Sequence, residues 1–441
     1  LPEVYEALNK TKSLSEKLLK IKELKDYDIE TPLKTSLYDF QKVEVKFLIV
    51  RGSGFTFSEM GCGKSIVSLA VALIQRKGFQ KSLIICPASV KSSWGNEIEK
   101  HTYNEKYLIL EGNAKERPKI LEKFFSDLTI TFLILNYELL RQDVLFLEGY
   151  TYSTIIADEV IRFKHQKTQT SKALKRLKSQ YRIGLSGYPV DNSPLDIYNP
   201  VDWACPGYLG SQWAFEDLYT QKVPMKVKDK KKDKDKKVTD KKDSKKKREF
   251  REFKMIVGFR NLAHLKKKLD PLYIRHLKSE VLDLPPQVFQ VREIKLKGKT
   301  LEEYTRMRDE MRVRIQRMDN QEVEVKAHSV LIQLLRLSQL TDSFLTDESL
   351  KHPEWFGDCE KIKELDSIIE EVTASSSKVV IWSRWVPMVL KLYERYKNKY
   401  KAVYISGDVP VEDRGDVNHG IIGKFSKDPE CKCFIGQIQS G

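Results

Sequence analysis

The segment FSEMGCGKSIVSLAVAL, residues 57–73, places two glycines, a lysine and a serine between a short apolar run and a helix-like run. Glycines let backbone N–H groups converge on phosphate oxygens, the helix that follows presents its positive end, and a lysine adds a full charge. The predicted phosphate ligands are Gly61, Cys62, Gly63, Lys64 and Ser65. Ser65 is also a predicted Mg²⁺ ligand. The strict pattern requires glycine at position 58, where this chain has serine, so a structural turn is the alternative.

A second segment, TIIADEVI (154–161), is an apolar strand-like run that ends in Asp158 and Glu159. Two adjacent carboxylates at the end of a strand cost free energy unless they are solvated or bind a cation. In a nucleotide site Asp158 would orient Mg²⁺ and Glu159 would polarise the attacking water. A solvated strand end is the alternative, but its position after a phosphate loop favours a site for ATP and Mg²⁺, with Lys64, Asp158 and Glu159 as catalytic residues.

The elements that position these residues alternate between strand and helix. Apolar β-rich runs occupy 55–58, 82–86, 132–136, 154–158 and 182–186, and helical patterns such as 65–77 and 92–101 lie between them. This alternation predicts an α/β fold with a parallel sheet covered on both faces, whose functional residues lie at the carboxyl ends of the strands. A second unit alternates in the same way, with helices at 361–372, 386–399 and 411–425 and strands at 378–383, 402–406 and 431–436.

We therefore expect a helical segment at 1–30, a first lobe at 31–200, a helical insertion at 201–355 and a second lobe at 356–441. Within the insertion, residues 226–248 contain 14 Lys or Arg and 5 Asp, a net charge of +9 out of +16 for the chain. This tract has too few apolar residues to order itself, so a mobile surface loop is predicted. It would be either an electrostatic arm on DNA or a solvated loop without a dedicated role.

Composition narrows the class of protein. The six cysteines are scattered without zinc-site spacing, which favours reduced, intracellular thiols. No apolar run approaches a membrane span, and the N-terminus lacks a signal-peptide pattern and an initiator methionine. We expect an intracellular protein without a membrane partner, in the bacterial or phage-infected cytoplasm, or in the nucleus if the source is eukaryotic. Some N-terminal sequence would then be missing or processed.

At this point the motifs, taken in order, resemble those of superfamily 2 helicases and translocases of the Swi/Snf-like branch. The resemblance extends from about residue 35 to 441. The segments that carry it are LYDFQKVEVKFL (37–48), SEMGCGKS (58–65), LIICPASVKSSWGNEIEK (83–100), LNYELL (135–140), DEVIRFKH (158–165), LSGYPVDN (185–192), LYIRHLKSEVLDLPPQ (272–287), KVVIWSRW (378–385) and VYISGDV (403–409). It implies two RecA-like lobes with ATP between them, Gln41 as the adenine reader, and Ser186 and Gly187 as coupling residues.

The same resemblance implies contacts to a nucleic-acid backbone. The implied contact residues are Ser89, Lys91, Asn136, Tyr137, Lys164, Ser383, Arg384 and Gly407. Such contacts give affinity without sequence reading. Tyr137 could equally cover the core, Arg384 could cap an aromatic patch, and Trp94 is expected to pack rather than to stack on a base.

Three departures from the family pattern affect the expected activity. Val160 and Ile161 replace the usual Ala-His or Ala-Gln, and Tyr188 replaces a threonine. The printed sequence stops within the segment that resembles motif V, and motif VI, which supplies the arginine finger in this family, is not in it. We therefore expect the chain as written to bind ATP and to hydrolyse it poorly.

Three functions follow as hypotheses. The first is an ATP-dependent DNA helicase or translocase that acts on single-stranded, duplex or branched DNA, with forked replication or recombination intermediates favoured for a compact phage or bacterial enzyme. The second is a translocase that remodels protein–DNA complexes with little unwinding. The third is a nucleotide-gated DNA-binding module without turnover. RNA is disfavoured as a substrate because the resemblance is to the DNA-acting branch.

Overall fold

The computed structural model describes residues 13–228, 250–286, 288–316, 323–346, 353–357, 359–415 and 419–438. It divides into two units, Leu1–Pro285 and Pro286–Gly441. We describe each unit by itself. Within the described ranges, no helix is long and apolar enough to cross a membrane. The six cysteines all fall in these ranges and form no disulfide.

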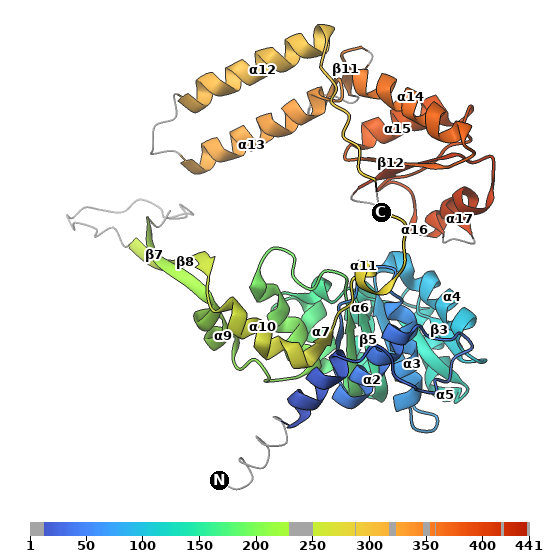
Figure 1. Ribbon diagram of the computed structural model, residues 1–441. Helices are drawn as coiled ribbons and strands as arrows, with labels where there is room; N and C mark the ends of the chain where they lie inside the picture. The colour runs from blue at the N-terminus through green and yellow to red at the C-terminus, as the bar shows by residue number, and fades with distance from the viewer. Residues whose placement is uncertain are drawn as a thin grey trace. The chain divides into compact units, whose positions relative to one another are not determined.

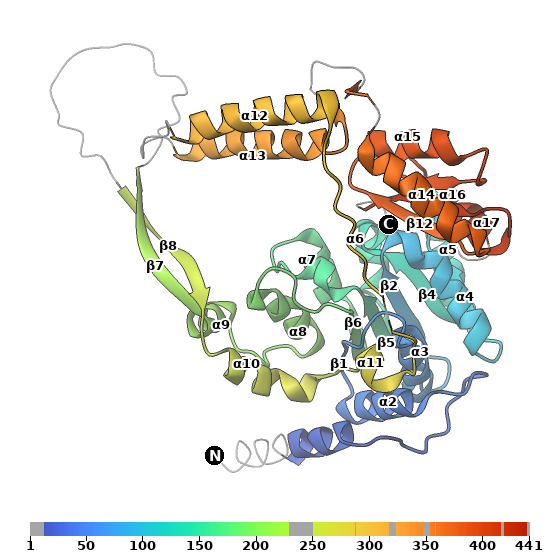
Figure 2. The same cartoon turned by 45° about the horizontal axis from the view of Figure 1, so that its top comes forward.

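The first unit is built on a seven-stranded parallel sheet with strand order β3-β4-β2-β5-β6-β1-β9 (Figures 1 and 2). The strands are β1 (Gly54–Thr56), β2 (Ser82–Cys86), β3 (Lys106–Ile109), β4 (Ile130–Asn136), β5 (Thr151–Asp158), β6 (Lys178–Leu185) and β9 (Tyr273–Ile274). Because all the strands are parallel, their carboxyl ends lie along one edge of the sheet. The predicted α/β fold class is confirmed.

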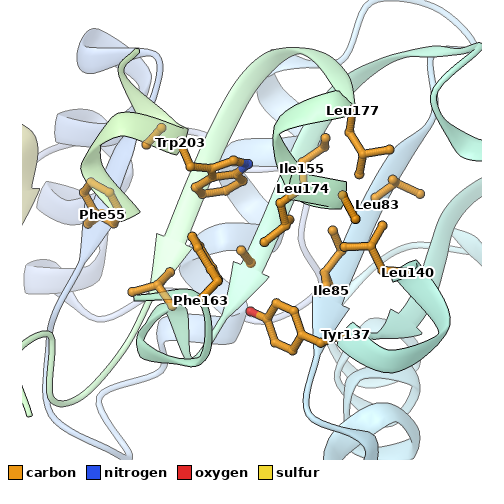
Figure 3. Close-up of a cluster of buried hydrophobic side chains, with 14 of the residues drawn as sticks. Phe55, Leu83, Ile85, Tyr137, Leu140, Ile155, Phe163, Leu174, Leu177 and Trp203 are labelled. Carbon is orange, nitrogen blue, oxygen red and sulfur yellow. The ribbon is translucent and has the colours of Figure 1, made fainter. Parts of the chain in front are cut away.

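Each face of this sheet has its own apolar core, because consecutive side chains of a strand point to opposite faces. In β2, Leu83 and Ile85 pack in one core, whereas Ile84 and Cys86 pack in the other. Figure 3 shows part of the first core, where Phe163 lies against Trp203 with ring centroids 5.5 Å apart. Because both faces of the sheet are packed against a core, the ends of its strands are held in place, and so are the starts of the loops that follow them.

Helices cover both faces, as the alternation predicted. One core includes residues of α2 (Asp39–Arg51), α3 (Lys64–Gln75), α4 (Lys91–His101) and a helix over 13–22. The other includes residues of α5 (Arg117–Ser126), α6 (Tyr137–Leu147), α7 (Gln169–Arg176), α8 (Tyr198–Ala204), α9 (Gln212–Tyr219) and α10 (Leu262–Leu269).

A β-hairpin leads away from this sheet and back to it. Strands β7 (Thr220–Lys228) and β8 (Phe250–Phe259) pair in antiparallel fashion, with Lys228 opposite Phe250. The predicted lysine-rich loop 226–248 begins in β7, and its residues 229–248 lie outside the described residues. After β8, the chain passes through α10 and a 3₁₀ turn, Asp270–Leu272, and β9 then pairs with β1 at the edge of the sheet.

The second unit contains a three-stranded parallel sheet with strand order β12-β14-β13. Its strands are β12 (Val379–Ser383), β13 (Val403–Ile405) and β14 (Cys433–Gln437), and its helices include α14 (Glu360–Ala374), α15 (Val386–Tyr396), α16 (Val411–Arg414) and α17 (Gly420–Lys427). Helices α12 (Gly298–Gln316) and α13 (Val323–Leu340) lie side by side, and β10 (Phe344–Leu345) pairs with β11 (Glu354–Trp355).

The expected insertion 201–355 stays a prediction. The division between the units falls within it: its part up to Pro285 lies in the first unit, where Leu265 and Leu272 join the core, and the remainder lies in the second. One expected element differs from the structure. The single helix expected at 411–425 is two helices. Gly415, which follows α16, has φ +68°, a left-handed conformation that ends the helix there.

Candidate nucleotide site

The phosphate loop, residues 58–65, follows β1 and ends in the first turn of α3. Gly61 has φ +87° and Gly63, the N-cap of α3, has φ +80°, and both values belong to the left-handed region that favours glycine. The Lys64 ammonium donates hydrogen bonds to the carbonyls of Ser58 at 2.9 Å and Glu59 at 3.1 Å. Burial lowers the pKa of Lys64, while the carboxylates of Glu159 and Asp158 raise it. The lysine therefore lies inside its own loop, within electrostatic reach of the acidic pair.

The side chain of Gln41, on α2, contacts the backbone of the phosphate loop. Its side chain is 5% exposed. Its Nε2 donates to the carbonyl of Cys62 at 3.0 Å, and its Oε1 accepts from the backbone N–H of Tyr38 at 3.0 Å. A β-carbon added at Gly63 would lie 2.3 Å from the Gln41 Nε2. Gln41 therefore positions the phosphate loop, and its predicted reading of adenine stays a prediction.

The acidic pair lies at the end of β5. One Asp158 carboxylate oxygen accepts from Trp94 Nε1 at 3.0 Å, and the other accepts from the backbone N–H of Glu159 at 3.0 Å. Burial raises the pKa of Asp158, the Trp94 hydrogen bond lowers it, and the neighbouring Glu159 raises it. Glu159 has φ +53°, so the chain turns sharply directly after the aspartate. Trp94 is buried, as its expected packing role requires, and in addition orients this carboxylate.

The end of β6 joins the phosphate loop to the acidic pair, because β6 lies between β1 and β5 in the sheet. The Ser186 hydroxyl donates to Glu159 Oε2 at 3.2 Å, and the Ser186 N–H donates to the Thr56 carbonyl at 3.3 Å. A β-carbon added at Gly187 would lie 3.9 Å from the Lys64 Nζ. Ser186 and Gly187 therefore lie between the lysine and the glutamate; their predicted coupling role remains a prediction.

A buried carboxylate behind the phosphate loop was not predicted from the sequence. Glu44 on α2 is fully buried and accepts hydrogen bonds from three groups. These are the hydroxyl of Thr56 at 2.8 Å, the hydroxyl of Ser58 at 2.5 Å and Nδ1 of His276 at 2.9 Å. Ser58, which occupies the position of the missing glycine, thus connects the loop to α2 and to the chain after β9. The only sequence signal was that Glu44 lies between two valines in the run VEVKFL, in which Lys46 is the other charged residue.

The predicted nucleic-acid residues of the first unit have different surroundings. Ser89 is exposed, and half-buried Lys91 donates from Nζ to the Leu110 carbonyl at 3.2 Å. The Lys164 ammonium pairs with Asp191 at 2.9 Å and with Asp196 at 3.3 Å. A lysine that already faces two carboxylates has less net charge to offer a phosphate, so Ser89 and Lys91 remain the better candidates.

Asn136 and Tyr137 are both buried in this structure, and their predicted nucleic-acid contacts stay predictions. Asn136 is 8% exposed and donates from Nδ2 to Glu138 at 2.8 Å, and Tyr137 is 2% exposed. The Tyr137 hydroxyl donates to the Asp158 carbonyl at 2.5 Å, and its ring packs in the core shown in Figure 3. These contacts suit the core alternative for Tyr137, whose hydroxyl also contacts the last residue of β5.

In the second unit, the three predicted nucleic-acid residues lie at the carboxyl ends of β12 and β13. Arg384 is exposed, with its guanidinium carbon 5.1 Å from the centroid of the Trp385 ring, an arrangement that suits the aromatic-cap alternative. Half-buried Ser383 accepts from the Trp385 N–H at 3.2 Å. The exposed Gly407 N–H donates to Gln437 at 3.2 Å. These contacts leave the DNA role of all three as a prediction.

The fold and this site together define a RecA-like α/β unit with a phosphate loop. The chain belongs to the family described as the SNF2-related domain, which matches residues 40–344. The expected Swi/Snf-like branch is thereby confirmed.

Similar proteins include two groups of curated relatives. The chain is 23% identical over 415 residues to an uncharacterized ATP-dependent helicase of Mycoplasma genitalium. This match covers 92% of this chain and 35% of that protein. It is 28% identical over 293 residues to the TATA-binding protein-associated factor BTAF1 of Arabidopsis thaliana, covering 63% of this chain and 13% of that protein. The chain thus spans about a third or less of the length of these relatives.

Among solved structures, the chain is similar to the SWI2/SNF2 ATPase core of Sulfolobus solfataricus in complex with dsDNA. The TM-score is 0.47 and the sequence identity is 22%, over 93% of this chain and 80% of that one.

Proposed function

We propose that this chain belongs to an ATP-dependent DNA translocase or helicase, and that its first unit binds and hydrolyses the nucleotide. The observation that carries the proposal is the convergence of Lys64, Ser186 and Glu159 at the ends of three adjacent parallel strands. Membership of the SNF2-related family supports ATP as the substrate. The name of the Mycoplasma relative, an ATP-dependent helicase, points to the same activity.

Each residue of the site has a distinct role in this proposal. The backbone N–H groups of the phosphate loop and the Lys64 ammonium bind the phosphates of ATP. Glu159, oriented by the Ser186 hydroxyl, accepts a hydrogen bond from the attacking water and later its proton. Gln41 and Glu44 hold the loop in place from α2, so the binding groups need little rearrangement when ATP arrives.

The residues at the site also fit Mg²⁺. Within the described ranges, no group of three or more His, Cys, Asp or Glu side chains could hold a metal ion. Mg²⁺ in nucleotide sites is usually bound by one or two carboxylates together with the substrate phosphates. Asp158 and the Ser65 hydroxyl would supply that small set of ligands. The ion would neutralise charge that develops on the phosphate oxygens.

For the partner we propose DNA, with forked or branched molecules as the preferred form. The formal net charge of +16 favours a polyanion, and exposed Ser89, Arg384 and Gly407 are candidates for backbone contacts. The proposed result of ATP hydrolysis is movement along the DNA.

The test is ATP hydrolysis with single-stranded, duplex, forked and four-way DNA, measured for wild type and for Lys64→Ala in the longest natural protein that contains this chain. We expect Lys64→Ala to lower DNA-stimulated hydrolysis by at least about a hundredfold, since it removes a phosphate-binding charge. Lys77→Ala removes an exposed lysine just beyond α3 and serves as the control. Full activity of Lys64→Ala would contradict the assignment of the phosphate loop. ATP-dependent changes in DNA affinity without turnover would favour a nucleotide-gated DNA-binding module instead.

A second candidate is a translocase that displaces proteins from DNA with little unwinding. The observation that favours it is the similarity to TATA-binding protein-associated factors, with identities of 28% and 26% for those of Arabidopsis thaliana and Schizosaccharomyces pombe. A strand-displacement assay with and without a bound roadblock protein separates the two candidates. Displacement of the roadblock without strand separation would favour remodelling.

A further inference from the structure

A second lysine, Lys278, lies next to the phosphate loop in space, although in the sequence it is near the C-terminal end of the first unit. Lys278 is the first residue of α11 (Lys278–Val281), which follows β9. The end of β9 and the residues after it lie beside the start of the phosphate loop and form backbone hydrogen bonds with it. The Phe57 N–H donates to the Ile274 carbonyl at 2.8 Å, and the Glu59 N–H donates to the His276 carbonyl at 3.0 Å. The backbone N–H of Lys278 then donates to Glu59 Oε2 at 2.7 Å.

The side chain of Lys278 lies over Gly61. A β-carbon added at Gly61 would lie 3.0 Å from Cε and 3.2 Å from Nζ of Lys278. Burial raises the pKa of the Cys62 thiol, and the charges of Lys64 and Lys278 both oppose that rise, so both ammonium groups act on the same part of the loop.

The two lysines differ in how their charge is engaged. Lys64 Nζ donates to two loop carbonyls, whereas no hydrogen bond or ion pair joins Lys278 Nζ to another residue in the described part of the chain. Its stem is half-buried and its backbone is fixed by Glu59. An ammonium group held at a glycine-rich anion loop without an acceptor is arranged for a ligand that carries negative charge.

We propose that Lys278 is a second phosphate-binding cation of the nucleotide site, supplied by the chain after β9. This inference rests on the proposed function. Two contacts place the lysine: the His276 ring binds Glu44 at 2.9 Å, and the His276 N–H donates to the Ser58 hydroxyl at 2.9 Å. Glu44 and His276 are therefore positioning residues, and Lys278 is the group that contacts the substrate.

The experiment measures equilibrium binding of ATP, ADP and AMP to the full chain by displacement of a fluorescent ATP analogue. We expect Lys278→Met to weaken ATP binding about tenfold to a hundredfold, as for the loss of a charge-assisted hydrogen bond. AMP binding should change less, because AMP carries fewer phosphate charges. Lys278→Arg should restore most of the affinity. Lys267→Met, which removes an exposed lysine from the last turn of α10, is the matched control.

Lys278→Gln provides a second variant that keeps a polar side chain and the backbone N–H to Glu59. The proposal requires both neutral variants to lose ATP affinity while the control keeps it. Wild-type affinity in either neutral variant, or an equal loss for ATP and AMP, would overturn it. Absence of ATP binding by the wild-type chain would be a different result, because it would remove the proposed function itself.

Discussion

At the scale of single residues, Asp158 occupies an environment that opposes its own charge. It is buried next to Glu159, and both factors raise its pKa, whereas the hydrogen bond from Trp94 lowers it. A metal-binding aspartate must be ionised, so Trp94 keeps the carboxylate available over a wider range of pH. This role could not be predicted from the sequence, because Trp94 and Asp158 are 64 residues apart and an apolar aromatic is more often a packing residue.

We predict that Trp94→Phe shifts the acid limit of Mg²⁺-dependent ATP binding to higher pH. Phenylalanine retains most of the packing but removes the donor that lowers the pKa of Asp158, so protonation sets in at a higher pH as the solution is acidified. The measurement is binding of a fluorescent ATP analogue against pH, with and without Mg²⁺. Trp213→Phe, at an exposed position, is the control. A midpoint that stays in place or moves to lower pH would refute the assigned role.

At the scale of elements, the site is held by a helix, a strand end and an edge strand that share one buried carboxylate. Glu44 of α2 binds Thr56 of β1, Ser58 of the loop and His276 beyond β9. A buried carboxylate is tolerated only when its hydrogen bonds are satisfied, and here three donors satisfy it. The arrangement therefore makes the position of the loop depend on two other elements.

We predict that Glu44→Ala lowers the free energy of unfolding by about 3–5 kcal/mol, because it leaves a cavity and three unpaired polar groups. Glu44→Gln, which keeps the shape and one acceptor, should cost less. Urea unfolding followed by tryptophan fluorescence measures both values. Glu122→Ala, at an exposed position of α5, should stay within about 0.5 kcal/mol of wild type. A loss for Glu44→Ala no larger than that of this control would show that the three hydrogen bonds contribute little.

The strands that carry the site could be predicted because they are continuous apolar runs; the expected run 82–86 coincides with β2. Strand β9 could not, since it has two residues and its place depends on pairing with a distant strand. The same holds for Glu44 and His276, which are 232 residues apart. Local patterns report periodicity and charge, whereas these contacts are decided by tertiary pairing.

At the scale of the whole molecule, charge is concentrated in one tract. Residues 226–248 contribute +9 to the formal charge of +16, which leaves +7 for the rest of the chain. A strongly positive segment would be expected to steepen the dependence of DNA affinity on salt. Against this, the tract interleaves aspartates with its lysines and contains no aromatic residue for base stacking.

We predict that replacing residues 229–249 by Asn-Gly changes the slope of log affinity against log salt by less than about one unit. Because Lys228 pairs with Phe250, a two-residue turn keeps β7 and β8 joined. DNA affinity is measured between low and physiological salt, and a glycine–serine loop of the original length controls for the shortening. A reduction of the slope by several units would instead establish the tract as a DNA-binding arm.

The late return of β9 to β1 also matters for how the protein is made. Ser58 and its partner His276 are 218 residues apart, so a ribosome needs about 10 to 40 s after releasing the first before the second emerges. Throughout that interval β1 lacks its neighbour β9, and an unpaired strand edge can pair with other chains. We therefore expect the nascent chain to need chaperones at β1, the strand that precedes the phosphate loop, until β9 has been synthesised.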